Sequence, residues 1–171
     1  RIVNIEDPMK GTYLGCSFSN GEIINYLNKI NASFKELKDE ELFKQLAEIL
    51  DEGKVVGWFN GAMEFGPRAL GGRSIIGDPR NKKMQSIMNL KIKYRESFRP
   101  FAPAVLEEDV DKLFEINTKS PYMLLVSKVK KDLCRNMTKD EKELFGIEKL
   151  NIQRSSLPAI THVDYSARIQ T

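Results

Sequence analysis

The sequence predicts a mixed α/β or α+β domain, because helical and strand-like patterns alternate along the whole chain. Amphipathic runs with a period near 3.6 residues indicate the helices, and short runs of β-branched and aromatic residues indicate the strands. Of the 171 residues, 41% are hydrophobic and 30% are charged. This composition is typical of a soluble globular domain with a sizeable core and argues against disorder.

The first helix is predicted to begin at Ser19, after an irregular segment over residues 1–18. Ser19 and Glu22 have the spacing of a capping box, in which each side chain bonds the backbone N–H of the other residue. The apolar positions of one helix face are Ile23, Ile24, Leu27 and Ile30.

A second helix is predicted to follow, with Asp39 as its cap and Gly53 at its end. Its inward-facing residues are Leu42, Leu46 and Ile49. Residues 55–59 then read as a short buried strand, and Ile75-Ile76 begins another.

Farther along the chain, residues 81–93 are predicted to be helical. The inner face of this helix holds Met84, Ile87 and Met88. Thr138 and Glu141 have capping-box spacing for a short helix that ends near Gly146. The other predicted elements are an extended segment over 98–103, a strand over 104–106, a helix over 107–114, a strand over 122–129, a loop over 147–157, and strand pieces over 159–163 and 167–169 around a turn at 164–165.

Positive charge is concentrated in one window, although the net charge of the chain is only +3. The window from Arg68 to Arg99 holds nine basic residues and only two acidic ones, so it carries +7 and the remainder carries −4. Such a concentration suggests an anionic partner. For the cluster over residues 80–83, a solvated helix face is the favoured interpretation.

Arg68 and Arg73 lie in a loop over residues 60–74 that also contains four glycines and a proline. Glycines let a backbone expose its N–H groups to a ligand, and guanidinium groups bind phosphate or carboxylate oxygens in pairs. Ser74 adds a hydroxyl to this loop. Three further basic residues follow after one predicted helix: Lys93, Arg95 and Arg99. We expect the two groups to meet in one pocket that takes a substrate with several phosphate oxygens.

Other interpretations of these residues remain open. The loop fits neither a Walker A sequence nor a Rossmann fingerprint, and its glycines could simply serve turns. Arg99 stands between apolar neighbours, so its charge is expected to need a partner from protein or ligand. On residue type alone, His162 is expected to be hydrogen-bonded within a strand rather than catalytic.

Cysteine and histidine content bears on compartment and metal binding. Cys16 and Cys134 are predicted to be reduced thiols of a cytoplasmic protein. With a single histidine and no cluster of cysteines, no classical zinc site is expected. No apolar run approaches the roughly 20 residues that a membrane helix needs, so no membrane partner is expected.

Residues 63–75, Met-Glu-Phe-Gly-Pro-Arg-Ala-Leu-Gly-x-Arg-Ser-Ile, resemble the hallmark of the carbamoyltransferase C-terminal domain. That family includes nodulation-factor and antibiotic O-carbamoyltransferases. The segments that match its pattern in the same order are Asp78-Pro79-Arg80, the run from Met88-Asn89 to Pro103, Ser120-Pro121-Tyr122-Met123, Thr161-His162-Val163-Asp164, and residues 167–171. A thirteen-residue loop with ordered downstream segments is far more specific than one short motif.

The resemblance implies a YrdC-like α/β fold, a twisted mixed sheet with flanking helices, over residues 19–171, with residues 1–18 as a lead-in. It implies that carbamoyl phosphate and ATP, accompanied by Mg²⁺, form carbamoyl-adenylate for transfer to an acceptor hydroxyl. The implied catalytic residues are Arg68, Lys93, Arg99 and Arg168. The predicted substrate- or nucleotide-binding residues are Gly66, Arg73, Ser74, Arg95 and His162, and no metal ligand is predicted in this chain.

The chain also departs from the family pattern. The family has an N-terminal Kae1-like, metal-binding part, which we expect as a partner in the full-length protein, and an Asn-Thr-Ser-Phe-Asn segment beyond the matched region. We therefore expect a truncated domain with incomplete activity. Two alternatives are an inactive fragment that keeps the fold and an RNA-binding YrdC-like module. RNA is the less favoured partner, since few aromatic residues accompany the basic ones: Tyr94, Phe98 and Phe101.

Overall fold

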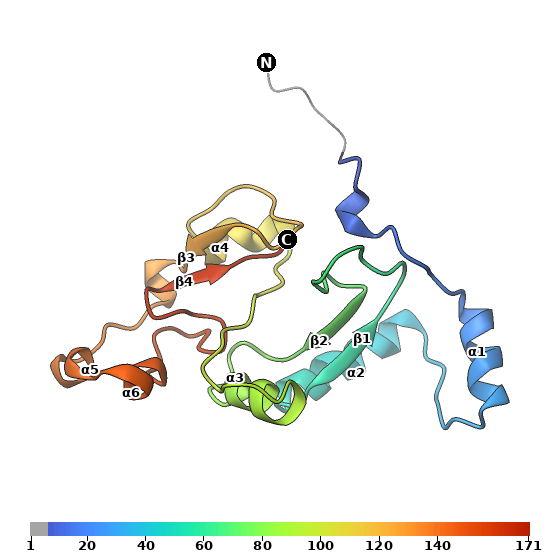
Figure 1. Ribbon diagram of the computed structural model, residues 1–171, viewed down its shortest axis with the longest axis horizontal. Helices are drawn as coiled ribbons and strands as arrows, with labels where there is room; N and C mark the ends of the chain where they lie inside the picture. Colours follow the sequence, from blue (N-terminus) through green and yellow to red (C-terminus); the bar gives the residue numbers. More distant parts are fainter. Residues whose placement is uncertain (1–6) are drawn as a thin grey trace, which may run out of the picture. The chain divides into compact units, whose positions relative to one another are not determined.

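The computed structural model describes residues 7–171 and confirms a mixed α/β chain of short helices and small antiparallel sheets (Figure 1). The chain divides into two compact units. Unit 1 holds the residues up to Glu52 together with Val56–Ile76, and unit 2 holds Gly53–Val55 together with Gly77–Thr171. The predicted lead-in over residues 1–18 lies partly outside the described residues.

Unit 1 begins with the 3₁₀ turn Lys10–Thr12 (η1) and the helix Asn20–Lys29 (α1). The predicted capping box is confirmed: the Ser19 hydroxyl accepts the Glu22 backbone N–H at 3.3 Å, and the Glu22 carboxylate accepts the Ser19 backbone N–H at 2.8 Å. The predicted inner face of α1 is not buried, because every residue of this helix is at least partly exposed.

The second helix of unit 1 spans Asp39–Asp51 (α2). The prediction that Asp39 caps it is wrong by one residue, because the extended residue Lys38 occupies the cap position and no side chain bonds there. Asp39 is the first helical residue, where its negative charge complements the helix dipole. The apolar residues predicted to face inward are half-buried, namely Leu42, Leu46 and Ile49.

The strands Val56–Phe59 (β1) and Arg73–Ile76 (β2) pair antiparallel, which confirms that this part of the chain holds two strands. The predicted start of the second strand is wrong, because Ile75 and Ile76 end β2 instead of beginning it. The register places the last residue of β1 opposite the first residue of β2, so residues 60–72 form the loop of a β-hairpin. Helix α2 contacts β1 (Figure 1). Alternate residues of β1 are exposed, so this strand is half-buried instead of buried as predicted.

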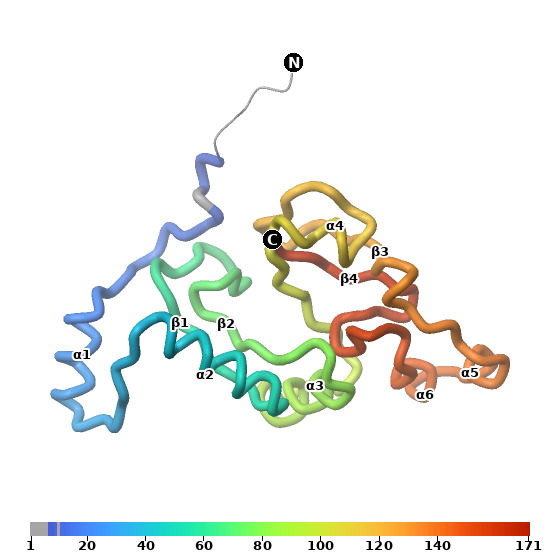
Figure 2. The backbone as a smooth tube through the Cα atoms, turned by 180° about the vertical axis from the view of Figure 1, so that it is seen from behind, coloured from blue at the N-terminus to red at the C-terminus, as the bar shows by residue number. Residues whose placement is uncertain are grey.

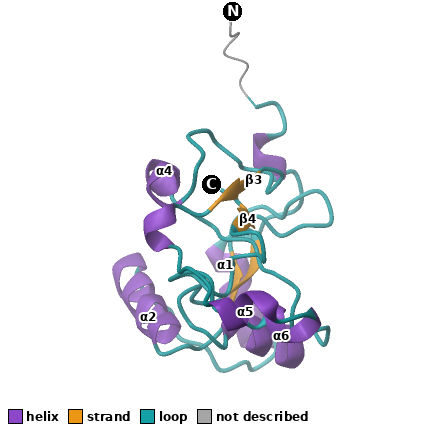
Figure 3. Ribbon diagram, turned by 90° about the vertical axis from the view of Figure 1, so that its left-hand side faces the viewer, coloured by secondary structure: helices purple, strands orange, loops and turns teal. Residues whose placement is uncertain are grey.

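Short helical segments and long loops make up most of unit 2 (Figure 3). The helices predicted over 81–93 and 107–114 are confirmed, each split into two parts. The helical segments of the unit are Met84–Ile87 (α3), the π-helical turn Met88–Ile92 (η2), Glu107–Asp109 (η3), Val110–Leu113 (α4), Lys131–Leu133 (η4), Lys139–Glu143 (α5) and Gly146–Leu150 (α6).

The predicted capping box of α5 is confirmed, since the Thr138 hydroxyl accepts the Glu141 backbone N–H at 3.2 Å and the Glu141 carboxylate accepts the Thr138 backbone N–H at 2.8 Å. The loop predicted over 147–157 is partly wrong, because its first residues belong to α6. Helices α5 and α6 lie next to each other (Figures 1 and 3), and Lys149 Nζ donates to the Lys142 carbonyl at 3.0 Å.

The sheet of unit 2 pairs Val126–Lys128 (β3) antiparallel with Ser166–Arg168 (β4). Strand β3 is shorter than the predicted run over 122–129, and β4 begins and ends one residue before the predicted run over 167–169. The strand predicted over 159–163 is wrong. That segment follows Pro158 and forms turns.

A single parallel bridge, between Ala104 and Gln170, replaces the strand predicted over 104–106. Gln170 follows β4 by two residues, in the segment that runs from β4 to the C-terminus (Figure 2). The two two-stranded ribbons confirm a mixed α/β architecture. The YrdC-like arrangement of one twisted mixed sheet stays a prediction.

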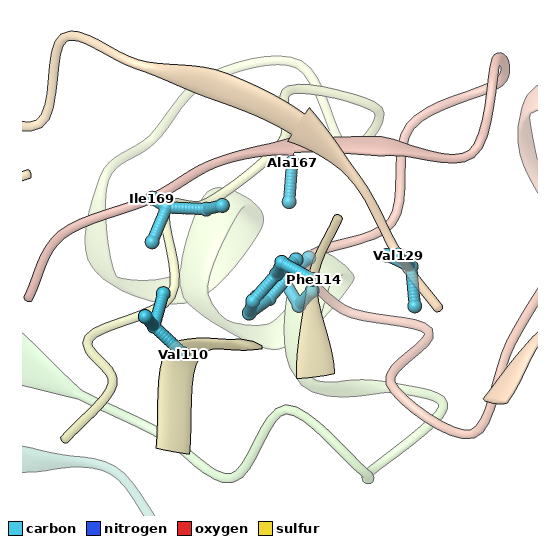
Figure 4. Packing of buried hydrophobic residues seen from close by; sticks show 6 residues of the cluster. Val110, Phe114, Val129, Ala167 and Ile169 are labelled. Carbon is cyan, nitrogen blue, oxygen red and sulfur yellow. The ribbon is translucent and has the colours of Figure 1, made fainter. Parts of the chain in front are cut away.

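Two apolar clusters form the core of unit 2. The larger one lies between α4 and the β3–β4 ribbon (Figure 4), and its buried members are Val110, Phe114, Val129, Ile160, Ala167 and Ile169. In the smaller one, Met84 and Met88 pack against Ala159, with Val55 and Phe101 beside them. From residue 7 onward, no helix combines the length and the apolar character needed to cross a bilayer.

Candidate functional site

The hairpin loop of unit 1 is organised around the buried carboxylate of Glu64. Its Oε1 accepts the backbone N–H groups of Leu70 at 2.5 Å and Gly72 at 2.7 Å, and its Oε2 accepts Arg73 Nε at 3.2 Å. Burial opposes ionisation of this carboxyl, but the backbone N–H donors and the Arg73 guanidinium outweigh it, so the pKa of Glu64 lies below its usual value. The ionised Glu64 carboxylate is therefore a fixed part of the loop.

Arg73 and Ser74, both predicted to bind substrate, make bonds within the loop. Arg73 Nη2 donates to the carbonyls of Gly66 at 2.6 Å and Glu64 at 3.2 Å. The Ser74 hydroxyl accepts the Gly71 backbone N–H at 3.0 Å. These contacts shape the loop and occupy groups that would otherwise face a ligand.

Arg68 lies exposed near the middle of this loop. Its guanidinium makes no hydrogen bond or ion pair with any residue that the structure describes. Gly66, two residues earlier, has φ +130°, a conformation that side chains rarely adopt, so glycine is required at this bend. The loop thus leaves one guanidinium free to bind an anion.

In unit 2, Asn89 holds the segment that contains Lys93, Arg95 and Arg99. Asn89 is fully buried, and its amide Nδ2 donates to the carbonyls of Ser97 at 3.0 Å and Arg99 at 2.8 Å. Its Oδ1 accepts Arg95 Nε at 2.6 Å. Every polar atom of this side chain is bonded, so the segment is tied to η2.

The basic residues of this segment have different surroundings. Lys93 is exposed, and its side chain makes no hydrogen bond or ion pair with described residues. Arg95 lies 5.0 Å from the centroid of the Phe101 ring, and burial, reinforced by the nearby charge of Arg99, lowers the pKa of Arg95. Arg99 pairs with Glu96 at 2.7 Å and is half-exposed, so the predicted partner for its charge is a surface carboxylate.

A pocket of about 390 Å³ in unit 2 lies beside the same segment. Ser97 and Phe98 form part of its wall, and its basic lining residues are Lys82, Arg154 and His162. Its lining includes no Asp or Glu. The side chains around this space therefore favour an anion over a cation.

Arg154 is a functional candidate that the sequence did not reveal. It is only 2% exposed, and its guanidinium donates to the carbonyls of Ile152 at 2.9 Å and Lys149. Within the described part of the chain, its Nε is buried without a partner. Burial lowers the pKa of Arg154. Nothing in the neighbouring residue types distinguishes it from a solvated loop arginine.

His162 lies in a turn, which corrects the strand predicted for it. Its backbone N–H donates to the Ser166 carbonyl at 2.8 Å, and its carbonyl accepts the Tyr165 N–H at 3.0 Å. Burial lowers the pKa of His162, opposed by Asp164 and reinforced by Arg168. Its side chain therefore lines the pocket as a neutral imidazole at neutral pH.

Arg168 lies on β4, half-buried, and its guanidinium makes no hydrogen bond or ion pair with residues 7–171. The predicted site residues thus fall into two groups, one in each unit. Gly66, Arg68, Arg73 and Ser74 belong to unit 1. Lys93, Arg95, Arg99, His162 and Arg168 belong to unit 2. A single pocket shared by both groups stays a prediction.

Comparison with known proteins gives one family and several relatives. A family model described as the carbamoyltransferase C-terminus matches residues 47–171. An uncharacterized protein of Synechocystis sp. is 62% identical over 173 residues, which cover 100% of this chain and 28% of that protein.

Two further relatives have more informative names. The nodulation protein NolNO of Sinorhizobium fredii is 38% identical over 135 residues, 77% of this chain and 17% of that protein. The 3'-hydroxymethylcephem-O-carbamoyltransferase of Amycolatopsis lactamdurans is 36% identical over 127 residues, 74% of this chain and 20% of that protein. The chain therefore spans less than a third of the length of these relatives.

Proposed function

Because the chain belongs to the carbamoyltransferase C-terminal family, we propose that it binds carbamoyl phosphate and ATP and forms carbamoyl-adenylate. The carbamoyl group then passes to an acceptor hydroxyl. One relative is named as an O-carbamoyltransferase, which supports transfer to oxygen. The wider protein, including a Kae1-like metal-binding part that receives the activated group, belongs to the same proposal.

The observation that carries this proposal is which arginine side chains have a partner inside the protein. Of the eight arginines within residues 7–171, six have a guanidinium that is bonded inside the protein. The two whose guanidinium makes no hydrogen bond or ion pair with described residues are Arg68 and Arg168. Both are residues that the family resemblance assigns to phosphate binding. A guanidinium left without an internal partner is suited to an anionic ligand.

The proposed reaction balances as two steps. Water cleaves carbamoyl phosphate, giving carbamate and inorganic phosphate. A carbamate oxygen then attacks the α-phosphorus of ATP, a new C–O–P linkage forms, and pyrophosphate leaves. The second step brings two anions together, and both steps release an anionic leaving group, so fixed positive charges are needed to offset the repulsion and to stabilise the leaving groups.

The positive groups of the chain have distinct proposed roles. Arg68, Lys93, Arg99 and Arg168 bind phosphate oxygens, and Arg154 is added to them because it lines the pocket of unit 2. His162 and Ser97 also line this pocket. Arg73 and Arg95 are bonded to Glu64 and Asn89, so their contribution is to hold the loops that contain the ligand-binding groups.

Mg²⁺ supplies charge neutralisation when it arrives with ATP, since its preferred ligands include phosphate oxygens. Between residues 7 and 171, no group of three or more His, Cys, Asp or Glu side chains is arranged to hold a metal ion. We therefore assign no residue of this chain as a ligand of Mg²⁺.

A titration that separates substrate binding from RNA binding tests the proposal. Calorimetry at low salt should detect heat when carbamoyl phosphate or ATP is added to the folded chain. Both affinities should fall as salt rises, because the attraction is electrostatic. Binding of single-stranded RNA with neither small ligand giving heat would overturn the proposal in favour of an RNA-binding module.

A further inference from the structure

The loop of unit 1 contains an unusual arrangement, a buried carboxylate inside an exposed hairpin turn. The Glu64 side chain is 0% exposed, whereas residues 65–68 are exposed. Burying a charge is costly unless it is paired and hydrogen-bonded. Here three donors converge on the Glu64 carboxylate, from Leu70, Gly72 and Arg73. The carboxylate therefore connects the first residues of the loop with its last.

Arg73 closes the same loop from the other direction. Its guanidinium reaches the Glu64 carboxylate, the Glu64 carbonyl and the Gly66 carbonyl. One donor, Nε, is directed at the Glu64 side chain, and the other, Nη2, is directed at the backbone of residues 64–66. Arg68 lies between Gly66, whose carbonyl is bonded to Arg73, and Leu70, whose N–H is bonded to Glu64. These two contacts limit the positions that the Arg68 backbone can take.

The surrounding residues support the same closure. A Cβ atom at Gly72 would lie 3.1 Å from Glu64 Oε2 and 2.8 Å from the Ala62 carbonyl, so glycine is needed beside the carboxylate. On the outer side, the Tyr13 hydroxyl donates to the Leu70 carbonyl, and the Phe65 N–H donates to the Thr12 carbonyl at 2.7 Å. The loop is thus a shaped structure before any ligand arrives.

We propose that Glu64 and Arg73 are positioning residues that hold the loop in the conformation that presents Arg68 to the anionic substrate. Arg73 acts through the loop and does not itself contact ligand. The inference rests on the proposed function, since it needs Arg68 to bind carbamoyl phosphate. It also changes the role of Arg73, which the sequence assigned to substrate binding.

A double-mutant cycle on carbamoyl phosphate affinity tests the positioning role. Arg68→Ala should weaken binding roughly 10- to 100-fold, as expected for loss of one charge-assisted contact. Arg73→Ala should have a similar effect. The double variant should bind within about threefold of the weaker single variant, because the two residues act as one unit. Lys112→Ala, which removes one exposed positive charge from α4, serves as the matched control and should leave affinity unchanged.

Amide hydrogen exchange provides a readout that does not depend on ligand. Arg73→Ala should accelerate exchange at the amides of Leu70 and Gly72, which Glu64 accepts, whereas Arg68→Ala should not. If Arg73→Ala does not fold, Arg73→Lys and Glu64→Gln are the milder changes. Arg73→Lys should restore part of the affinity, and Glu64→Gln should lie between the unchanged protein and Arg73→Ala.

The possible outcomes separate the positioning role from the proposed function. Losses that multiply in the double variant would show that Arg73 contacts ligand, and the positioning role would be overturned. Normal affinity in a folded Arg73→Ala variant would overturn it as well. If the unchanged protein bound no carbamoyl phosphate, the proposed function would fail, and the role of the pair toward substrate would fail with it.

Discussion

Two charged residues are buried among residues 7–171, and each is accommodated in a different way. Glu64 is matched by a guanidinium and two backbone N–H groups. Arg154 is matched only by carbonyl oxygens, and its Nε keeps no partner in the described chain. A buried cation without a carboxylate is electrostatically incomplete, which suits it to an anion in the adjoining pocket.

Lys93 and Arg99 are both exposed, so their removal should affect chemistry and leave packing intact. We predict that Lys93→Ala and Arg99→Ala each lower carbamoyl-dependent pyrophosphate release by the natural full-length protein at least tenfold, with an unchanged melting temperature. Pyrophosphate release and thermal unfolding are measured on the same samples. Lys91→Ala, which removes an exposed lysine of η2 two residues before Lys93, is the control. Normal release with a lowered melting temperature would assign these residues to structure.

At the scale of single elements, the sequence was informative where bonds are local. Both capping boxes could be predicted, since Ser19–Glu22 and Thr138–Glu141 bond within three residues of one another. Strand ends were predicted poorly, because a strand needs a partner that the local sequence does not reveal. Residues 159–163 have strand-like residue types but form turns after Pro158. Helix α6 was missed because it is short and lacks a side-chain cap.

Asn89 is the residue on which the segment from Lys93 to Arg99 depends. We predict that Asn89→Ala destabilises the protein by about 1–3 kcal/mol, because it leaves two carbonyls and the Arg95 Nε without this partner. Urea unfolding measures the change. Asn117→Ala, at an exposed position, should have no effect. Equal stability of the two variants would contradict the assignment of Asn89 as the residue that holds this segment.

The turn that follows His162 should respond to acid through Asp164. Its carboxylate accepts bonds from the Ser166 hydroxyl at 2.6 Å and the Ser166 N–H at 3.1 Å, and Lys128 is also bonded to it. These contacts, the Ser166 hydroxyl first, lower the pKa of Asp164 from 3.8 to about 2 despite partial burial. Other charged groups near the turn are Arg168 and, once protonated, His162.

The direction of the pH effect follows from the lowered pKa. Stabilisation by Asp164 is fully present above its ordinary pKa of 3.8 and is lost as the pH falls toward about 2. We predict that Asp164→Asn removes this acid-dependent part of the stability. A carboxyl-carbon NMR titration gives the pKa directly, and a value at or above 3.8 would refute the prediction.

At the scale of the whole molecule, the main feature is the uneven distribution of positive charge along the chain. The net charge is +3, yet the window from Arg68 to Arg99 carries +7 and crosses the division between the two units. The sequence could predict this concentration, because charge is read directly from residue types. It could not predict which arginines stay available, since that depends on partners such as Glu64 and Asn89 that are distant in sequence.

Amide exchange measured over the whole chain would show which basic groups bind the anion. We predict that carbamoyl phosphate slows exchange in residues 64–73 of unit 1 and in residues 89–99 of unit 2, because each segment holds an exposed cationic side chain without a partner in the described chain, Arg68 or Lys93. Raising the salt from about 0.05 to 0.5 M should move the midpoint concentration of each protection upward, since screening weakens attraction between exposed charges. Lys112→Ala should leave both midpoints in place. If carbamoyl phosphate protected neither segment of the folded chain, these groups would have no role in anion binding.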